Sequence, residues 1–246
     1  FTRLNKVLAQ SEPHAERFKD LGVKSGAIQV TGSVKFDLIP TTAKSNTDLD
    51  SFIKTKNIIA VSTHHGEDEI ILRAFIEVLT HFPNIKLIIV PRHPERAAAI
   101  FKLADKKNIS ACIESEGIDT KSSILIINSI GKTSVLYEST EAVFVGGSLV
   151  ERGGHNIIEP AFFACPIIIG PHMFNFESIA EEFINNDSCR VVYDSKSLAN
   201  EFIHLLANKD EALKMIEAAS KILDGNSGAS DRQLSVIMDF LEGANE

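Results

Sequence analysis

From residue 57 onward the chain alternates between short apolar runs and longer amphipathic stretches, and this alternation restricts the folds open to it. The apolar runs have strand length and lie at 57–63, 86–92, 122–128, 142–147, 165–170 and 189–193. Amphipathic stretches at 66–82 and 94–107 separate the first three runs. Strands that are apolar on both faces belong to parallel sheets covered by helices on both sides. The sequence therefore predicts an α/β fold with a Rossmann-like parallel sheet and helices on both faces.

The first part of the chain has a different pattern. A helix is expected from a capping Ser11 to Leu21, ending at Gly22, followed by a short strand within 27–32. The stretch Pro40–Asp48 is polar and rich in Pro, Thr, Ser and Asn, which is typical of a linker or an exposed connection. We expect a boundary between two parts of the chain near residue 40.

Composition excludes several classes of protein. The net charge is −8 and the basic residues appear singly, which argues against a nucleic-acid partner. The longest apolar runs are strand-length, too short for a transmembrane helix. Cys112, Cys165 and Cys189 are widely spaced in apolar segments and are expected to be buried free thiols. The chain begins at Phe1 without an initiator methionine or a signal peptide, which indicates a piece of a longer protein.

The run Val145–Pro160, VGGSLVERGGHNIIEP, contains the strongest local signal of a ligand site. An apolar strand ends in a loop with four glycines, and a helix is expected beyond it, with Asn156 and Glu159 three residues apart in its first turn. Glycines let backbone N–H groups approach a phosphate, so Gly147 and Ser148 are candidate phosphate contacts. Glu159 can accept hydrogen bonds from two ribose hydroxyls, although a helix N-terminus also favours an acid for electrostatic reasons alone. The run predicts a nucleotide site.

Other candidate residues follow the remaining strands, whose carboxyl ends share one edge of a parallel sheet. Ser62 and Thr63 end one strand and are candidate phosphate or sugar contacts, or else Thr63 caps the next helix. Arg92 and His93 end another, and Arg92 either binds an anion or pairs with Glu95. Arg96 is expected to be solvated or in a surface ion pair.

No metal or catalytic cluster is recognisable. The chain has no CxxC or HExxH pattern, and two adjacent histidines, His64 and His65, rarely face one ion without further ligands. No Ser/His/Asp set, paired glycosidase acids or Walker loop occurs. We therefore expect no metal and no cofactor. Either the chain is a binding domain, or the catalytic base comes from another domain.

These motifs together resemble the 3-deoxy-D-manno-octulosonic acid (Kdo) transferase family. The resemblance rests on AQSE, VTGSVKFD, STHHGEDE, PRHPER, FVGGSLVERGGHNIIEP and GPHMFNFESI, and it runs across nearly the whole chain. It implies the C-terminal, donor-binding half of a GT-B glycosyltransferase. Residues 1–40 would be a remnant of the N-terminal domain with the connection. Residues 41–246 would form the CMP-Kdo-binding domain, with the last helix packing back on the N-terminal domain.

The resemblance also implies a reaction: inverting, metal-independent transfer of Kdo from CMP-Kdo to a lipid A precursor, in lipopolysaccharide synthesis. The full-length protein would work at the cytoplasmic face of the inner membrane of a Gram-negative bacterium and touch that membrane peripherally. The catalytic base, membrane anchor and acceptor surface would lie upstream of Phe1. This fragment alone would then be soluble and inactive.

The resemblance assigns roles to individual residues. The CMP contacts are Pro91, Arg92, Ile130, Gly131, Lys132, Asn156, Ile157, Ile158 and Glu159. Lys35 matches a lysine that stabilises the transition state, although its sequence context alone predicts a solvated side chain. The segment Asn128–Thr133 reads N-S-I-G-K-T where the family commonly has D-T-x-G-E-L, so side-chain contacts there are expected to differ.

Two other classes of function fit the motifs less closely. One is another GT-B nucleotide-sugar enzyme, of the UDP-GlcNAc transferase or epimerase type. The other is a non-catalytic nucleotide-binding module.

Overall fold

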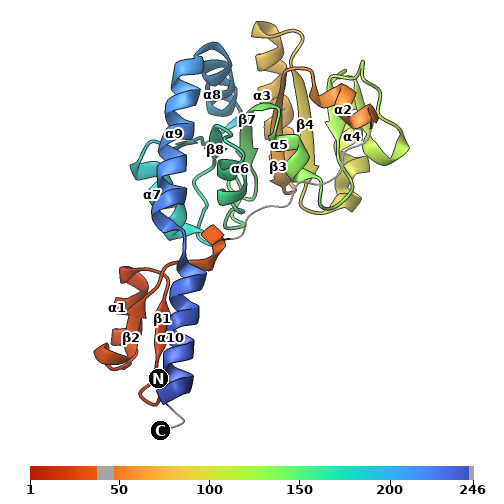
Figure 1. The fold of residues 1–246 in the computed structure, drawn as a ribbon. Coiled ribbons are helices and arrows are strands. Elements are labelled where there is room, and N and C mark those ends of the chain that lie inside the picture. The colour runs from red at the N-terminus through yellow and green to blue at the C-terminus, as the bar shows by residue number, and fades with distance from the viewer. Residues whose placement is uncertain (38–46, 244–246) are drawn as a thin grey trace. The chain divides into compact units, whose positions relative to one another are not determined.

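The computed structural model describes residues 1–37 and 47–243. Within them the chain forms two compact units, one from 1–37 with 222–243 and the other from 47–221. Each unit has its own secondary structure, shown in Figure 1.

The larger unit is built on a parallel sheet. Among the described residues it has seven strands in the order β5-β6-β4-β3-β7-β8-β9. Their bounds are β3 (Asn57–Thr63), β4 (Lys86–Pro91), β5 (Ala111–Ile113), β6 (Ile124–Ile126), β7 (Thr140–Val145), β8 (Ile167–Ile169) and β9 (Cys189–Val191). Each paired strand is parallel to its neighbour. The predicted Rossmann-like sheet is confirmed.

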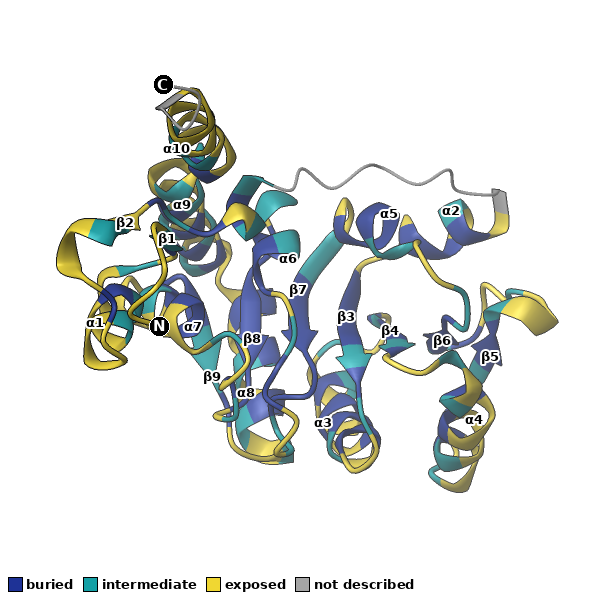
Figure 2. Ribbon diagram, turned by 90° about the horizontal axis from the view of Figure 1, so that it is seen from below, coloured by how far each residue is buried: buried dark blue, intermediate teal, exposed yellow. Residues whose placement is uncertain are grey.

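Helices cover both faces of this sheet, and Figure 2 shows α3, α4 and α8 along one face and α5 and α6 along the other. The bounds are α2 (Thr47–Ile53), α3 (Glu67–His81), α4 (Ala97–Lys106), α5 (Thr133–Tyr137), α6 (Ile158–Phe162), α7 (Glu177–Asn185), α8 (Ser195–Ala207) and α9 (Lys209–Asn226). The central strands are buried because both faces are covered; Ile58, Ile88 and Ile168 are all 0% exposed. Burying such side chains away from water is the main stabilising contribution to this unit.

The structure differs from the expected elements in a few places. The short strand β5 and the helix α2 were not expected, since neither has a clear periodic pattern over enough residues. The helix expected from residue 94 begins instead with a 3₁₀ turn, Pro94–Arg96, before α4. Most of the predicted linker, Pro40–Asp48, lies outside the described residues, and Thr47 already begins α2. All three cysteines are buried and free, as expected.

The smaller unit contains residues from both ends of the chain. It contains β1 (Val7–Ala9) paired in parallel with β2 (Ile28–Val30), and the helices α1 (Glu12–Asp20) and α10 (Ala229–Gly243). Asp37 accepts hydrogen bonds from the N–H groups of Gly228 (2.7 Å) and Ser230 (2.5 Å), which fixes the start of α10. Arg232 on α10 donates from Nε to the carbonyl of Thr31 at 2.8 Å.

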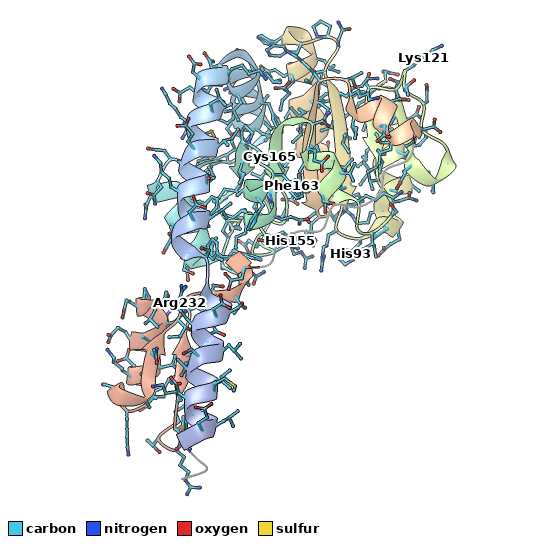
Figure 3. All side chains as sticks on the ribbon, viewed as in Figure 1. His93, Lys121, His155, Phe163, Cys165 and Arg232 are labelled. Carbon is cyan, nitrogen blue, oxygen red and sulfur yellow. The ribbon has the colours of Figure 1, made fainter. Side chains whose placement is uncertain are left out.

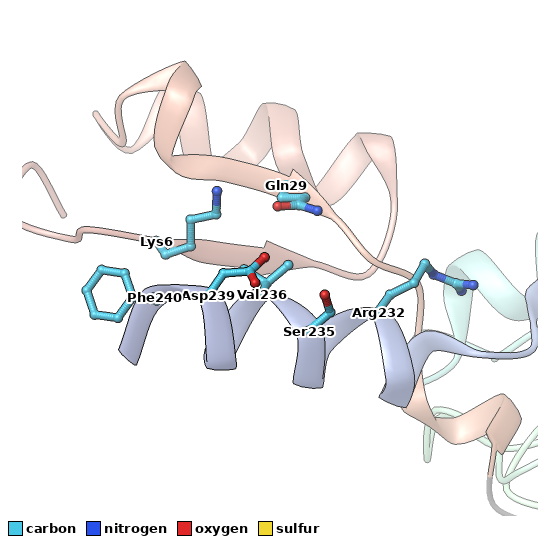
Figure 4. Close-up of a pocket in the computed structure, with 7 residues that line it drawn as sticks. All are labelled: Lys6, Gln29, Arg232, Ser235, Val236, Asp239 and Phe240. Carbon is cyan, nitrogen blue, oxygen red and sulfur yellow. The ribbon is translucent and has the colours of Figure 1, made fainter. Parts of the chain in front are cut away.

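Two further features belong to the smaller unit. Ser11 precedes α1 as expected but makes no capping bond, and its buried hydroxyl has no partner among the described residues. A cavity between α10 and the two strands is lined by Lys6, Gln29, Arg232, Ser235, Val236, Asp239 and Phe240 (Figure 4). Within residues 1–37 and 47–243, no helix combines the length and the hydropathy needed to cross a bilayer.

Candidate functional site

A cavity of about 290 Å³ opens at the carboxyl ends of β3, β4 and β6, beside α6. The chain builds outward from β3 to β4 and β6 on one side and then reverses to β7 on the other. Ligands of doubly wound sheets bind at such a reversal. The lining residues are Val61, Ser62, Val90, Pro91, Arg92, Pro94, Ile127, Ser129, Ile130, Gly131, Lys132, Thr133, Tyr137, His155, Asn156 and Glu159.

Arg92 is the cation at this cavity that is best placed to meet an anion. It follows β4 directly, its N–H donates to the carbonyl of Thr63 at 3.0 Å, and its side chain is exposed. Within the described ranges its guanidinium makes no ion pair; Glu95 instead lies 3.9 Å from Nδ1 of His93. Of the two alternatives for Arg92, the pair with Glu95 is therefore wrong. A guanidinium at a strand end can bind a phosphate in bidentate fashion.

Asn156 and Glu159 reach the cavity through a shorter helix than the sequence predicts. α6 covers only Ile158–Phe162, so Asn156 precedes the helix, and its Oδ1 accepts the N–H of Ile158 at 3.0 Å. The carboxylate of Glu159 accepts a hydrogen bond from Oγ1 of Thr133 at 3.0 Å. This bond holds one carboxylate oxygen and leaves the other oxygen able to accept hydroxyl protons of a ligand.

The loop 128–133 is held in place by Glu114, which sequence reasoning missed. The Glu114 side chain is 7% exposed, forms a short ion pair with Lys132, and accepts a hydrogen bond from Oγ of Ser129 at 2.7 Å. The ammonium of Lys132 is thus already paired, although the residue lines the cavity. Ile130 is 88% exposed at the rim and offers an apolar surface to a flat ligand ring.

The end of β3 is fixed by a buried hydrogen-bonded cluster. Ser62 has φ +55°, which is an uncommon conformation for a residue with a side chain. The pairing register between β3 and β4 shifts at this residue. The Thr63 hydroxyl donates to Asp68 at 3.0 Å instead of capping α3, whose N-cap is Gly66. Arg96 pairs with Asp68 and donates to the Thr63 carbonyl at 2.6 Å. The expectation of a solvated or surface-paired Arg96 is therefore wrong, since Asp68 is buried.

The glycine loop after β7 is organised by a buried carboxylate, Glu67, at the start of α3. Its oxygens accept the backbone N–H groups of His64 (2.8 Å), Gly147 (2.7 Å), Ser148 (3.1 Å) and Leu149 (3.0 Å). Burial raises the pKa of Glu67, and these four donors oppose that rise. The N–H groups that we expected to face phosphate are thus bonded to an acid of the protein.

Gly147 also makes room for two histidines. It has φ +69°, and a Cβ atom there would lie 2.9 Å from Cδ2 of His155 and 3.4 Å from Cδ2 of His64. Nε2 of His64 and Nε2 of His155 are 2.8 Å apart, which is a hydrogen bond. The ring of His93 lies edge-on to the ring of His64, with the two centroids 5.8 Å apart. Figure 3 shows His93 and His155 at the same edge of the larger unit.

The structure therefore gathers most of the predicted site residues and separates others from the cavity. The predicted residues that line it are Ser62, Pro91, Arg92, Ile130, Gly131, Lys132, Asn156 and Glu159. Those outside the lining are Thr63, His93, Gly147, Ser148, Ile157 and Ile158. Ile157 and Ile158 have buried side chains, which leaves their backbone atoms to meet a ligand. Lys35 lies in the smaller unit, in the 3₁₀ turn Val34–Asp37.

Sequence reasoning missed Glu67, Glu114 and His155. Glu67 is one of three consecutive acids, and only the fold distinguishes the one that bonds to a loop 80 positions along the chain. His155 lies inside the predicted run, directly before Asn156, and could have been named from that position. Among residues 1–37 and 47–243, no three His, Cys, Asp or Glu side chains are grouped so that they could hold a metal ion.

Two family models match the chain. Residues 44–222 match the model described as glycosyl transferases group 1. Residues 1–38 match the model described as 3-deoxy-D-manno-octulosonic-acid transferase (kdotransferase).

Curated relatives and a solved structure agree with these models. The 3-deoxy-D-manno-octulosonic acid transferase of Haemophilus influenzae is 30% identical, over 98% of this chain and 58% of its own length. The Rickettsia felis enzyme of the same name is 30% identical over 96% of this chain and 52% of its own length. The chain thus spans about half the length of the curated relatives it matches.

The solved structure is the C-terminal CMP-Kdo-binding domain of WaaA from Acinetobacter baumannii. It is 30% identical, matches 71% of this chain and 93% of its own length, and superposes with a TM-score of 0.67. This match places the parallel sheet in the C-terminal half of the GT-B architecture. The fold, the two family models and these similarities show that the chain belongs to the Kdo transferase family, as a part that includes the C-terminal donor-binding domain.

Proposed function

We propose that the cavity beside α6 binds CMP-Kdo, and that the longer protein containing this chain transfers Kdo to a lipid A precursor. One observation carries the proposal: three groups suited to the three parts of CMP line one cavity at the strand reversal, in a chain 30% identical to a CMP-Kdo-binding domain. They are Arg92 for the phosphate, Glu159 for the ribose, and the exposed rim at Ile130 and Gly131 for the base.

Each group matches its part of the nucleotide by chemistry. The guanidinium of Arg92 offers paired N–H donors to phosphate oxygens. The carboxylate of Glu159, oriented by Thr133, accepts hydrogen bonds from ribose hydroxyls. Ile130 packs against the face of the base, and backbone atoms of the loop 128–133 form hydrogen bonds with the edge of the base. The backbone of Asn156–Glu159 completes the sugar and phosphate contacts.

The proposed reaction is an inverting substitution. A hydroxyl oxygen of the acceptor attacks the anomeric carbon of Kdo on the face opposite the nucleotide, and the bond from that carbon to the phosphate oxygen breaks. A base outside this chain takes the hydroxyl proton. Arg92 stabilises the negative charge that develops on the departing CMP, so a fixed cationic side chain provides the charge stabilisation that a metal ion provides in other phosphate sites. For Lys35 we keep the role of transition-state stabiliser that the resemblance implies.

The acceptor, the base and the site of the reaction belong to the proposal as well. Because the chain spans about half the length of its relatives, we assign the base and the acceptor surface to the remainder of the protein. Transfer then takes place at the cytoplasmic face of the inner membrane, with peripheral contact to that membrane. The 246 residues alone bind the donor without transferring it.

An assay of the longer protein tests this proposal. Transfer of Kdo from CMP-Kdo to a lipid A precursor is measured for the unaltered protein, for Arg92→Ala, and for Arg73→Ala as a control on the exposed side of α3. Loss of a charged hydrogen bond costs about 1.5–3 kcal/mol, so we expect kcat/KM to fall about 10- to 150-fold for Arg92→Ala. Arg73→Ala should change little. Absence of transfer by the unaltered, folded protein contradicts the proposed reaction.

A further inference from the structure

The histidine pair beside the nucleotide cavity has no role in the function proposed so far. The imidazole rings of His64 and His155 lie in nearly parallel planes, inclined by 2°, with their centroids 5.1 Å apart and their Nε2 atoms 2.8 Å apart. His155 lines the cavity directly before Asn156. Gly147 leaves the space that the two rings fill, so the glycine loop is shaped around this pair.

The hydrogen bond between the two rings limits how many protons the pair can hold. Each neutral imidazole carries one ring proton, so one Nε2 donates and the other accepts. One added proton can enter at Nδ1 of the donating ring, and the bond between the rings then becomes charge-assisted. A second added proton would place hydrogens on both Nε2 atoms and break the bond. The intact pair therefore carries no charge or one positive charge.

The surroundings keep the pair uncharged while no anion is bound. The charged and titratable groups that face it are Arg92, His93, Arg96, Arg152 and the Glu67 carboxylate. Burial, followed by the positive neighbours, lowers the pKa of His64 to about 4 and lowers the pKa of His155 in the same direction. Glu67 does not offset these cations for a ligand, because its oxygens are bonded to four backbone N–H groups.

We propose that the His64–His155 pair is a binding subsite for an oxyanion of the ligand, and that the pair takes up one proton when this anion binds. With one charge, both Nδ1 atoms carry hydrogens, so either can donate to an anion that lies on its own side of the pair. In the empty site, the positive charges of the nearby arginines oppose protonation of the pair. The negative charge of a bound anion offsets these positive charges, so the pair can then take up a proton.

The identity of the ligand rests on the proposed function. A CMP-linked sugar acid brings two oxyanions, the nucleotide phosphate and the sugar carboxylate. Both have the chemistry that the pair would bind, and ligands that carry one, both or neither distinguish them.

Titration calorimetry of the 246-residue chain at pH 6.5 tests the subsite. Cytidine, CMP and CMP-Kdo are each titrated in two buffers of different ionisation enthalpy, so that the difference in heat reports the protons exchanged. We expect no uptake with cytidine. Uptake with CMP identifies the phosphate as the anion, and uptake with CMP-Kdo alone identifies the carboxylate.

Variants test whether the proton is taken up by the histidine pair. His64→Gln and His155→Gln should each abolish the uptake and weaken binding of the anionic ligand about tenfold, the equivalent of one pKa unit. His65→Gln is the matched control, because His65 is the exposed neighbour of His64, and it should behave as the unaltered chain. Binding of both CMP and CMP-Kdo without proton uptake in the unaltered chain overturns the subsite and leaves the proposed function standing.

An NMR titration keeps the test independent of both the variants and the nucleotide. The imidazole signals of His64 and His155 are followed against pH with and without saturating inorganic pyrophosphate. We expect pyrophosphate to raise the titration midpoint of the pair from about 4, the pKa of His64, to about 6.5 or above, because proton uptake at pH 6.5 requires a midpoint in that range. Unchanged midpoints with pyrophosphate, CMP and CMP-Kdo overturn the subsite, whereas a raised midpoint in a chain that fails to bind CMP supports it and contradicts the proposed function.

Discussion

The carboxylate of Glu67 lies 2.7 Å from the backbone nitrogen of Gly147 and thereby joins the first turn of α3 to the loop after β7. The same carboxylate accepts three further N–H groups, from His64, Ser148 and Leu149. Strands β3 and β7 also approach closely here, since a Cβ atom on Gly146 would lie 2.7 Å from the Ser62 carbonyl oxygen. The loop is therefore shaped by the protein's own acid before any ligand binds.

Replacing this acid should destabilise the fold. Glu67→Ala leaves four backbone donors without their acceptor, and each unsatisfied buried donor costs about 1–3 kcal/mol. Partial access of water to the vacated space reduces the sum, so we expect a loss of roughly 3–5 kcal/mol in the free energy of unfolding. Urea denaturation measures it. Glu69→Ala, which removes an exposed pair with Arg73, should cost under about 1 kcal/mol; equal losses for the two variants would refute the role of Glu67.

The ion pair between Glu114 and Lys132 predicts a rescue experiment. Lys132→Glu places two carboxylates together at a half-buried position and should cost about 1–3 kcal/mol of stability, and it should also weaken CMP binding by displacing the loop at Ile130. Adding Glu114→Lys restores opposite charges and should recover part of both losses. The double variant is compared with each single variant by urea denaturation and calorimetry. Purely additive losses would show that the pair does not position the loop.

Glu159 should recognise the ribose and not the phosphate. Glu159→Ala removes hydrogen bonds to a charged carboxylate and should weaken CMP by about 1.5–3 kcal/mol. The same variant should weaken a 2′,3′-dideoxy analogue of CMP much less, because that ligand has no hydroxyls to donate. Thr133→Val, which frees the Glu159 carboxylate, should give a smaller loss in the same direction. Equal weakening of both ligands would place Glu159 outside the ribose site.

The stability of the empty chain should depend on His64 in mild acid. Its pKa is lowered from 6.5 to about 4 in the fold, so the unfolded chain binds a proton that the folded chain does not. Stability from this group is complete above pH 6.5 and falls as the pH drops from 6.5 toward 4. Glu67 acts in the opposite sense, because its raised pKa favours the fold at low pH.

A comparison with His64→Gln isolates the histidine term, since Glu67 is common to both chains. The unfolding free energy of the variant should fall less steeply between pH 6.5 and 4.5 than that of the unaltered chain. Parallel curves for the two chains would show that His64 does not titrate as its surroundings require.

The sheet could be predicted from sequence because its evidence is local. Each apolar run, such as Asn57–Thr63, carries its strand signal within a few residues, and parallel pairing places the carboxyl ends at one edge. Arg92 follows from that placement and Glu159 from the run Val145–Pro160, and the structure brings both to one cavity.

The missed parts of the site depend on pairs that are distant in sequence. Glu67 and Gly147 are 80 positions apart, and His64 and His155 are 91 apart. Nothing local separates Glu67 from the two acids that follow it, and the loop glycines fit a phosphate as well as they fit an imidazole pair. The same limit explains Arg96, whose buried partner Asp68 lies 28 positions earlier in the chain.

Titration calorimetry with CMP, UMP, UDP and cytidine tests the central claim most directly, because it measures which nucleotide the 246-residue chain binds. We predict that CMP binds, that UMP and UDP bind more weakly, and that cytidine loses the part of the affinity that Arg92 supplies. Arg92→Ala should weaken CMP by about 1.5–3 kcal/mol and leave cytidine unchanged. A preference for a uridine nucleotide, or no binding of CMP by the folded chain, would contradict the account.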